Sequence, residues 1–566
     1  MKRNRLFCLL PALLALVLLA PGAAAQTPNA ARSTTAIVVN DRAEVLYGYN
    51  IGGNNYYRLR DVAALLAGTS SRFSVDFNAA TGRILLTAGA DYQPPRGSRL
   101  PDFPSDETPR RVSTPIELGG VRLDLDAYNI GGNSYFKLRD LGQALSFYVA
   151  WDGRAIYIDT KPPEGSVRML SPFPFSGYDN RLTARYPRWA AAPTSFLAAR
   201  ETGGFHGVVV RKDRLDLFAL DPWYRLQGTS ELPLELRLFG TFYSGRDHYY
   251  LVFGQSNQSQ QDDREVIRIS RYTKQFEKVD SLSLTGAQLQ STEPFAFGAC
   301  RLAERTGQLT LHTARLCYQN AEGLNYQAQL TAVVDTARMQ AVNPLGARQE
   351  NDMQNAFDQF VAYDGDVPVL VGHGSGLPRA VMLHKGQGPG SYTAVSLLAI
   401  PGDKDAHATG VSVGGLAVTD SHYLVPLSSV DHSLVREYGQ QSLQGDHVDQ
   451  RNLLLCVLPR SLDGPVEQRR IATYVGSATT PSTPYLVQLS GDRLLLLWQE
   501  FSALSGDRGD MRALLLAADG SPVGDAAVLP GYALSDCAPI ATADNLVVWM
   551  AEAHGITTVY RLQVNF

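Results

Sequence analysis

Cysteine and charge are both scarce in this sequence. It has 5 cysteines among 566 residues, and charged residues make up 19% of the chain, below the usual quarter. A chain of this length has enough apolar material for a sizeable core and does not need a disulfide framework. The formal net charge of −4 gives no bulk attraction to nucleic acid or to an anionic membrane. We therefore exclude nucleic acid as a partner and expect no disulfide-stapled fold.

The cysteines that follow the N-terminal segment are scattered. Cys300, Cys317, Cys456 and Cys537 form no C-x-x-C pair and show no zinc-type spacing. We predict that they are buried free thiols. A bridge between Cys300 and Cys317, which flank one predicted hairpin, is the alternative.

Sequence signatures of catalysis and of metal binding are absent as well. There is no G-x-S-x-G elbow, no H-E-x-x-H pair and no P-loop. The segment from Gln26 to Pro163 has neither histidine nor cysteine, and the ten histidines beyond it include no H-x-H pair. Tight copper sites need several imidazole or thiolate ligands. We predict no metal and no cofactor.

The N-terminus has the pattern of a secretory signal peptide. Lys2, Arg3 and Arg5 precede an apolar run from Leu6 to Ala20, and Ala23-Ala24-Ala25 gives an A-x-A cleavage pattern before Gln26. The run is too short for a membrane span, and no second run approaches that length. We predict a signal peptide at 1–25, with an uncleaved anchor as the alternative, and a secreted protein associated with the cell wall.

A fourteen-residue phrase occurs twice. Tyr49–Val62 reads YNIGGNNYYRLRDV, and Tyr128–Leu141 reads YNIGGNSYFKLRDL. An internal repeat is strong evidence of a repeated structural unit. In both copies the Gly-Gly turn suits a hairpin, the leucines that follow share one helical face, and a second pair of strands comes after them. Each unit is therefore predicted to be ββαββ.

The phrases YNIGGN, LRDL and WDG resemble the stalk domain, also called the copper amine oxidase N-terminal-like domain, over residues 34 to 160. The resemblance implies an accessory module of secreted bacterial proteins and no oxidase activity. Oxidase chemistry belongs to a separate domain with a cofactor-forming Tyr in an Asn-Tyr-Asp/Glu setting. Here Tyr57 follows Asn55-Tyr56, and Gln327 follows Asn325-Tyr326.

The repeated motif itself has two interpretations. In the first, its Asn and Gly residues shape turns and its tyrosines pack between sheet and helix. In the second, Tyr56, Tyr57, Tyr135 and Phe136 form an aromatic platform for sugar. Alternation along a strand would bury half of these four.

Proline-rich stretches mark the expected domain boundaries. We predict a signal peptide at 1–25, stalk repeat 1 at 34–92, a linker at 93–111, stalk repeat 2 at 112–160, a linker at 161–180 and an all-β domain at 181–566.

The pattern beyond residue 180 indicates a β-propeller. Tight turns followed by β-branched and aromatic runs recur at a mean interval of about 55 residues, close to the larger blade periods. We expect each turn to join the two inner strands of a blade. The last unit ends soon after Thr557–Val564, so a strand from before the first full unit would complete it and close the ring. The prediction is seven blades, with six blades or a pair of β-sandwiches as alternatives.

Two polar clusters in this domain are candidate ligand-binding residues. One is His373 with Arg379, just after a predicted inner strand. The other comprises Asp431, His432, Asp446, His447 and Asp449, in the unit with the longest interval. Loop insertions of this kind often make a binding face, and the residues of the second cluster are of the types that serve as metal ligands or as an acid/base pair. Their alternative roles are a hydrogen-bonded turn histidine and a solvated loop.

We therefore predict a multidomain, non-enzymatic protein, with a small α+β stalk region that presents a β-propeller binding domain. The expected partner is a cell-wall glycan or an extracellular protein, with no membrane span after signal removal. One alternative is a polysaccharide-active propeller hydrolase or lyase, because propeller enzymes need no linear motif. The other is a purely structural envelope protein.

Overall fold

A computed structural model describes residues 29–565 except 41, 70, 95–107, 113–114, 120, 124, 146, 152–153, 161–165, 171–191, 202, 223, 404–405 and 554–555. The expected signal peptide at 1–25 and most of both expected linkers lie outside the described residues. The chain divides into two compact units, Met1–Phe147 and Tyr148–Phe566. Among the described residues, no helix has the length and apolar character needed to cross a membrane.

The two copies of the repeated phrase form the centre of one sheet in the first unit. Its strand order is β1-β4-β5-β12-β11-β8. Strand β5 of the first copy pairs antiparallel with β12 of the second, with Tyr57 opposite Phe136. The bounds are β1 Ala30–Arg32, β4 Gly48–Ile51, β5 Asn54–Arg58, β8 Arg110–Val112, β11 Ala127–Ile130 and β12 Asn133–Lys137. The two repeats therefore share one sheet and do not form separate domains.

Each copy leads into a short helix and then a hairpin, in the ββαββ order that the repeat predicts. Helix α1 spans Leu59–Leu65 and α2 spans Leu138–Leu145. After α1, β6 and β7 join a second sheet of order β10-β9-β7-β6. The remaining bounds are β2 Ala36–Val39, β3 Arg42–Glu44, β6 Phe73–Asn78, β7 Arg83–Ala88, β9 Ile116–Leu118, β10 Val121–Leu123, β13 Tyr148–Trp151 and β14 Ala155–Asp159.

The second unit is nearly all β-structure. Its described residues form seven antiparallel sheets of four or five strands. The first four are β16 Ser195–Ala199 to β19 Leu226–Pro233, β20 Leu238–Ser244 to β23 Lys278–Thr285, β24 Ser291–Pro294 to β28 Gln340–Ala341, and β29 Ala356–Asp364 to β32 Ser391–Ala399. The other strands of these four sheets are β17 Phe205–Val210, β18 Arg214–Leu220, β21 Tyr249–Gly254, β22 Glu265–Tyr272, β25 Cys300–Arg305, β26 Gln308–Cys317, β27 Gln327–Asp335, β30 Val367–Gly374 and β31 Ala380–Gly388. A four-residue helix, α3 Gly286–Leu289, precedes β24.

The other three sheets complete the set. One contains β33 Val411–Val413, β34 Ala417–Val418, β35 His422–Ser429, β38 Asn452–Pro459 and β39 Glu467–Ala472. The next contains β40 Thr479–Pro481, β41 Tyr485–Gln488, β42 Leu494–Ser502, β43 Arg508–Leu516 and β44 Ala527–Leu529. The last contains β45 Ile540–Ala541, β46 Leu546–Ala553, β47 Ile556–Gln563 and β15 Ser166–Leu170. A separate hairpin, β36 Val435–Tyr438 with β37 Leu443–Gly445, lies between β35 and β38.

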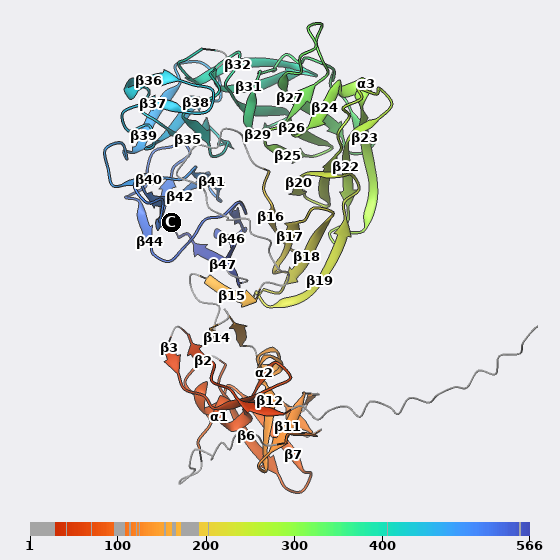
Figure 1. Cartoon of the computed structure of the whole chain (residues 1–566), viewed down its shortest axis with the longest axis vertical. Helices are drawn as coiled ribbons and strands as arrows, with labels where there is room; N and C mark the ends of the chain where they lie inside the picture. Colours follow the sequence, from red (N-terminus) through yellow and green to blue (C-terminus); the bar gives the residue numbers. More distant parts are fainter. Residues whose placement is uncertain are drawn as a thin grey trace, which may run out of the picture. The chain divides into compact units, whose positions relative to one another are not determined.

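Figure 1 shows these sheets arranged around a ring, with β16, β25 and β29 near its centre and β19 and β32 outside. Consecutive inner strands contact one another in the order β20, β25, β29, β34, β41 and β45. The ring closes where β15, from the N-terminal side of the domain, pairs with the last strand, β47. The expected closing strand is therefore confirmed, and the domain is propeller-like.

Side chains from neighbouring sheets make the core. Trp498 packs with residues of β38 and β42, and Trp549 with residues of β42, β46 and β47. Both tryptophans therefore pack between neighbouring sheets. The four described cysteines are buried free thiols, so the alternative of a Cys300–Cys317 bridge is wrong.

One tight turn does not fit the expectation that each such turn joins the two inner strands of a blade. Residues 211–213 join β17 to β18, the second and third strands of their sheet, because the strand before them, β16, is the innermost. The other turns join a strand at the inner edge of a sheet to the next strand outward, as expected; they lie near Gly245, Gly307, Gly365, Ser421, Asp492 and Asn545.

Candidate functional site

Arg379, one of the sequence candidates, holds loop backbone together. Its guanidinium donates hydrogen bonds to the carbonyl oxygens of Ser375, Pro401, Ala406 and Ala408. Burial lowers the pKa of Arg379. A guanidinium with four backbone acceptors has few N–H groups left for a ligand.

The two predicted clusters meet at one tyrosine. Arg379 lies over the Tyr438 ring at 5.4 Å from its centroid. His432 stacks on the same tyrosine, and its Nδ1 lies 2.7 Å from the Tyr438 hydroxyl. Burial, with the nearby Arg379 charge, lowers the pKa of His432 to about 4. Arg379 and His432 therefore pack against the same tyrosine. The sequence analysis had placed them in two separate clusters.

The other candidates in this insertion do not converge. Asp431 caps the short helix His432–Leu434 by accepting a hydrogen bond from the Ser433 backbone N–H at 3.1 Å. Asp446, His447 and Asp449 are exposed, and His447 bonds Gln450 at 2.9 Å. In the part of the chain that the structure describes, no three His, Cys, Asp or Glu side chains gather as a metal site. A ligand-binding role for these residues stays a prediction.

His373 leads instead to a carboxylate that the sequence did not single out. The His373 ring is fully buried in β30, and its edge contacts Phe357 with ring centroids 4.3 Å apart. Its Nδ1 lies 3.2 Å from Oδ2 of Asp358 on the inner strand β29. A buried imidazole in this position orients the carboxylate, as the outer partners of reactive groups commonly do.

Asp358 has an unusual backbone. Its φ is +57°, and the pairing of β29 with β30 shifts register between Phe357 and Phe360. Its carboxylate also accepts a hydrogen bond from the Val413 backbone N–H at 3.1 Å and is 17% exposed. Left-handed non-glycine residues and bulges concentrate at functional sites.

Arg301 stands beside Asp358 on the inner strand of the preceding sheet, β25. Its guanidinium lies 4.7 Å from the centroid of the Phe360 ring. Among the described residues it has no hydrogen bond and no ion pair with another side chain. Burial lowers its pKa, while the charges of Tyr485 and Asp358 act in the opposite direction. It is a partly exposed cation, and among the described residues no carboxylate lies within ion-pair distance of it.

Two further inner groups extend the set. Tyr485 in β41 donates to the Ser535 carbonyl at 2.8 Å, and burial, with the charge of Asp536, raises its pKa. Asp536 precedes β45 and accepts hydrogen bonds from the Thr194 backbone N–H at 2.6 Å and the Ser195 hydroxyl at 2.7 Å. We define the inner-strand cluster as Arg301, Asp358, Tyr485 and Asp536.

Three members of the inner-strand cluster, Arg301, Asp358 and Tyr485, lie in strands of three different sheets, and Asp536 lies in the segment before β45. The charges of Tyr485 and Asp358 act to raise the pKa of Arg301 against the effect of burial. For Tyr485, the charge of Asp536 raises the pKa and that of Arg301 lowers it. A set of two carboxylates, one cation and one phenol contains the groups that general acid–base chemistry uses. No motif joins these residues in the sequence. The one sequence feature that these four residues share is their position, several residues before one of the recurrent tight turns.

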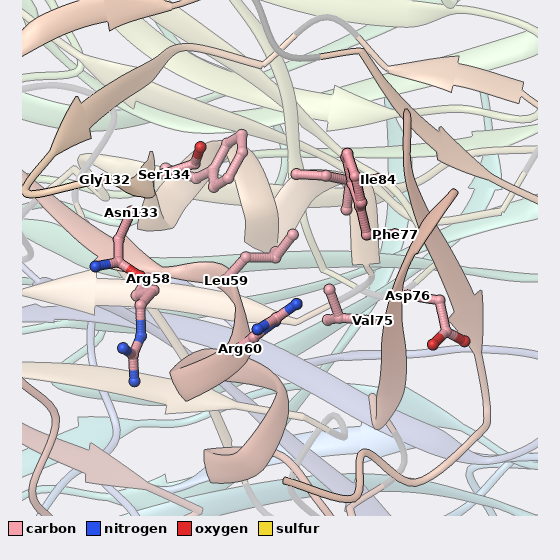
Figure 2. Close-up of a pocket in the computed structure, with 11 residues that line it drawn as sticks. Arg58, Leu59, Arg60, Val75, Asp76, Phe77, Ile84, Gly132, Asn133 and Ser134 are labelled. Atoms are coloured by element: carbon pink, nitrogen blue, oxygen red, sulfur yellow. The ribbon is translucent and has the colours of Figure 1, made fainter. Parts of the chain in front are cut away.

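A separate cavity of about 270 Å³ lies within the first unit (Figure 2). It is lined by Arg58, Leu59, Arg60, Val75, Asp76, Phe77, Ile84, Gly132, Asn133, Ser134 and Phe136. The aromatic platform considered from the sequence is wrong, because Tyr56, Tyr57, Tyr135 and Phe136 are all buried. Tyr56 and Tyr135 pack with Tyr49 and Ile130 on one face of the sheet; Tyr57 and Phe136 lie on the other.

No family model matches the sequence, and the comparison with curated proteins gave no match. Solved structures with a similar fold include a xylan β-1,4-xylosidase from Bacillus halodurans C-125, at 15% identity and TM-score 0.27, covering 52% of this chain and 59% of that one. A β-1,3-galactosidase of the GH43 family matches at 12% identity and TM-score 0.25, covering 50% and 92%. An endo-arabinase from Bacteroides thetaiotaomicron VPI-5482 matches at 11% identity and TM-score 0.28, covering 59% and 95%.

These neighbours are consistent with a propeller-like all-β domain. This chain spans less than two thirds of the xylosidase's own length, and the similarity is too distant to assign an activity. All three neighbours are named as glycan-cleaving enzymes, and they contradict the prediction of a non-enzymatic protein. That prediction is therefore withdrawn.

Proposed function

We propose that the protein is a secreted, polysaccharide-cleaving enzyme whose catalytic centre is the inner-strand cluster of a seven-bladed propeller. The observation that carries this proposal is a pair of carboxylates, Asp358 and Asp536, each held in place by hydrogen bonds, with Arg301 and Tyr485 near enough for their charges to act on one another. Cleavage of a glycosidic bond needs one carboxyl group as acid and a second as base or nucleophile. Asp358 and Asp536 are the two carboxylates of this cluster.

Asp358 is the group we assign to the reaction. Its carboxylate is partly exposed, although the backbone around it is held in a left-handed conformation. The surrounding structure must over-determine such a conformation, and such sites are enriched in function. His373 acts behind it as a positioning residue, since its ring is fully buried. A His373→Gln variant should shift the pH–rate profile and retain substrate affinity.

A lyase reaction is the second candidate, and Arg301 favours it. Elimination from a uronic-acid polymer needs a cation to neutralise the sugar carboxylate and a base to remove the adjacent proton. Arg301 is a cation without an ion-pair partner among the described residues, and Tyr485 is a phenol within its electrostatic reach. The two reactions give different products: a new reducing end alone, or a reducing end with an unsaturated sugar.

A turnover screen on the full-length chain tests the proposal. The substrates are xylan, arabinan, β-1,3-galactan and polygalacturonate, with release of reducing ends and absorbance of unsaturated sugars measured in parallel. We expect one polymer to be cleaved and the Asp536→Asn variant to cleave it more slowly by at least about a hundredfold. Absence of cleavage of every polymer, or equal rates in wild type and variant, would overturn the assignment.

The first unit would serve as a stalk module that keeps the propeller at the cell wall. The repeated phrase and the shared central sheet support this part of the proposal. Export is tested by sequencing the N-terminus of the protein recovered from culture medium. A chain that begins at Gln26 is expected, and a chain that retains Met1 and stays inside the cell would contradict it.

A further inference from the structure

Two arginines share one face of the inner strand β25. The residues on either side of Arg301 belong to the hydrophobic core shared with the preceding sheet, so alternation turns Arg301 and Arg305 the other way. Each lies over an aromatic ring of the next inner strand, β29, near the centre of the ring of sheets (Figure 1). The Arg301 guanidinium is 4.7 Å from the centroid of Phe360, and that of Arg305 is 5.9 Å from the centroid of Tyr363. The two arginines therefore occupy similar positions.

Only one of these two arginines has an anionic partner in the protein. Arg305 pairs with Asp366, and its Nε donates to the Gln308 side chain at 3.1 Å. Arg301 has neither an ion pair nor a hydrogen bond with another described residue, although burial lowers its pKa. A cation drawn out of bulk water is costly unless an anion or hydrogen-bond acceptors compensate it. The unpaired guanidinium of Arg301, which stays partly exposed, therefore points to an anion that the protein itself does not supply.

The nearby carboxylate of Asp358 does not serve as that anion. Its charge acts on Arg301, but its Oδ2 is engaged elsewhere, 3.1 Å from the Val413 backbone N–H and 3.2 Å from Nδ1 of His373. Its Oδ1 has no hydrogen bond with another described residue. One guanidinium and one carboxylate oxygen are thus left without protein partners in neighbouring inner strands. A ligand that combines an anion with hydroxyl groups satisfies both.

We propose that Arg301 binds the carboxylate of a uronic acid, so that the substrate of the inner-strand cluster is an acidic polysaccharide. The inference rests on the proposed function for the choice of a polysaccharide, and it holds for hydrolysis and for elimination alike. The planar guanidinium presents parallel N–H groups that match a carboxylate. The negative charge of Asp358 disfavours a doubly charged group such as phosphate. A hydroxyl group of the same sugar donates to the open oxygen of Asp358.

Binding of defined trisaccharides to the full-length chain, measured by calorimetry, tests this site without requiring turnover. The probes are trimers of galacturonate, glucuronate and mannuronate, each with its methyl ester, which keeps the sugar skeleton and removes the charge. A trimer of galactose 6-sulfate distinguishes a sulfate ester from a carboxylate. The variants are Arg301→Gln and Arg301→Lys. Arg305→Gln is the matched control, because it removes an arginine from the same face of β25 that already has a partner.

We expect one uronate trimer to bind at least about tenfold more tightly than its methyl ester, and Arg301→Gln to abolish that preference. Arg301→Lys should keep part of the preference, because it retains the charge but loses the fork of N–H groups. Arg305→Gln should bind like wild type. The melting temperature of Arg301→Gln should not fall, because the substitution removes a cation that has no partner among the described residues.

Three results would overturn the carboxylate site: equal affinity for every trimer and its ester, tighter binding of the sulfated trimer, or a preference for the acid that survives Arg301→Gln. Binding and turnover fail separately. Cleavage of a neutral polymer without binding of any uronate would refute this inference and leave the proposed function standing. Uronate binding that depends on Arg301, without cleavage of any polymer, would support the carboxylate site and refute the proposed enzyme.

Discussion

Ring closure gives the most direct stability prediction. Val167 in β15 is fully buried and packs with Leu197, Val548 and Val559, residues from both ends of the ring. In Val167→Ala, the chain loses the transfer free energy of the removed carbons and gains a cavity, a cost of about 2–3 kcal/mol. The second unit has about 420 residues, and its unfolding entropy is therefore roughly 0.9 kcal/mol/K. The melting temperature should fall by about 3 °C.

Differential scanning calorimetry of the full-length chain measures this shift. Val45→Ala is the matched control, because Val45 is 71% exposed and its loss should change the melting temperature by less than about 1 °C. The melting temperature of Val167→Asp should be lower than that of Val167→Ala, because the aspartate also buries a carboxylate without a partner. If Val167→Ala melts like Val45→Ala, β15 does not close the ring and the reasoning is refuted.

Three further predictions concern pH, thiols and metal. Burial lowers the pKa of His312 to about 3 and of His384 to about 4, while an unfolded histidine titrates near about 6.5. Below pH 6.5 the unfolded chain therefore binds more protons than the folded chain. The free energy of unfolding should fall as the pH drops from 6.5 toward 4, by about 3 kcal/mol for His384. A melting temperature that stays constant between pH 7 and 4 would contradict this. Burial raises the pKa of Cys300, Cys456 and Cys537 to about 12, so an aromatic disulfide reagent should label these thiols only after denaturation, and rapid labelling of the native chain would count against their burial. Equimolar copper should leave the melting temperature unchanged and should be lost on dialysis, since a ligand specific to the folded state would raise it; one copper retained per chain would show this expectation to be wrong.

Local patterns predicted the order of the elements well, but they could not identify the site. The Gly-Gly turn and the leucine stripe are short-range signals, and they lead correctly to β4, β5 and α1. Regular tight turns likewise led to the sheets and to closure by β15. The turn at residues 211–213 was wrongly expected to join the two inner strands of its sheet, because β16 precedes both strands that it joins. The order of strands within a sheet depends on tertiary contacts, which local patterns do not reveal.

The residues of the site are determined by contacts between sheets. Asp358 and Asp536 are 178 positions apart in the chain, and only the ring brings Arg301 and Tyr485 into the same electrostatic environment. The burial of Tyr56 and Tyr57 has the same kind of origin. Alternation along the strand predicts that these two side chains point to opposite faces of the sheet. It does not predict that both faces are covered, so that both side chains are buried.

The initial rate of polysaccharide cleavage by Asp358→Asn tests the central claim most directly. The substitution keeps the size of the side chain and removes its charge. Asp525→Asn is the matched control, because Asp525 is exposed in a loop. On the polymer that the wild-type chain cleaves, we expect Asp525→Asn to retain the full rate and Asp358→Asn to lose at least about a hundredfold, with an unchanged melting temperature. Equal rates for the two variants would contradict a catalytic centre on the inner strands.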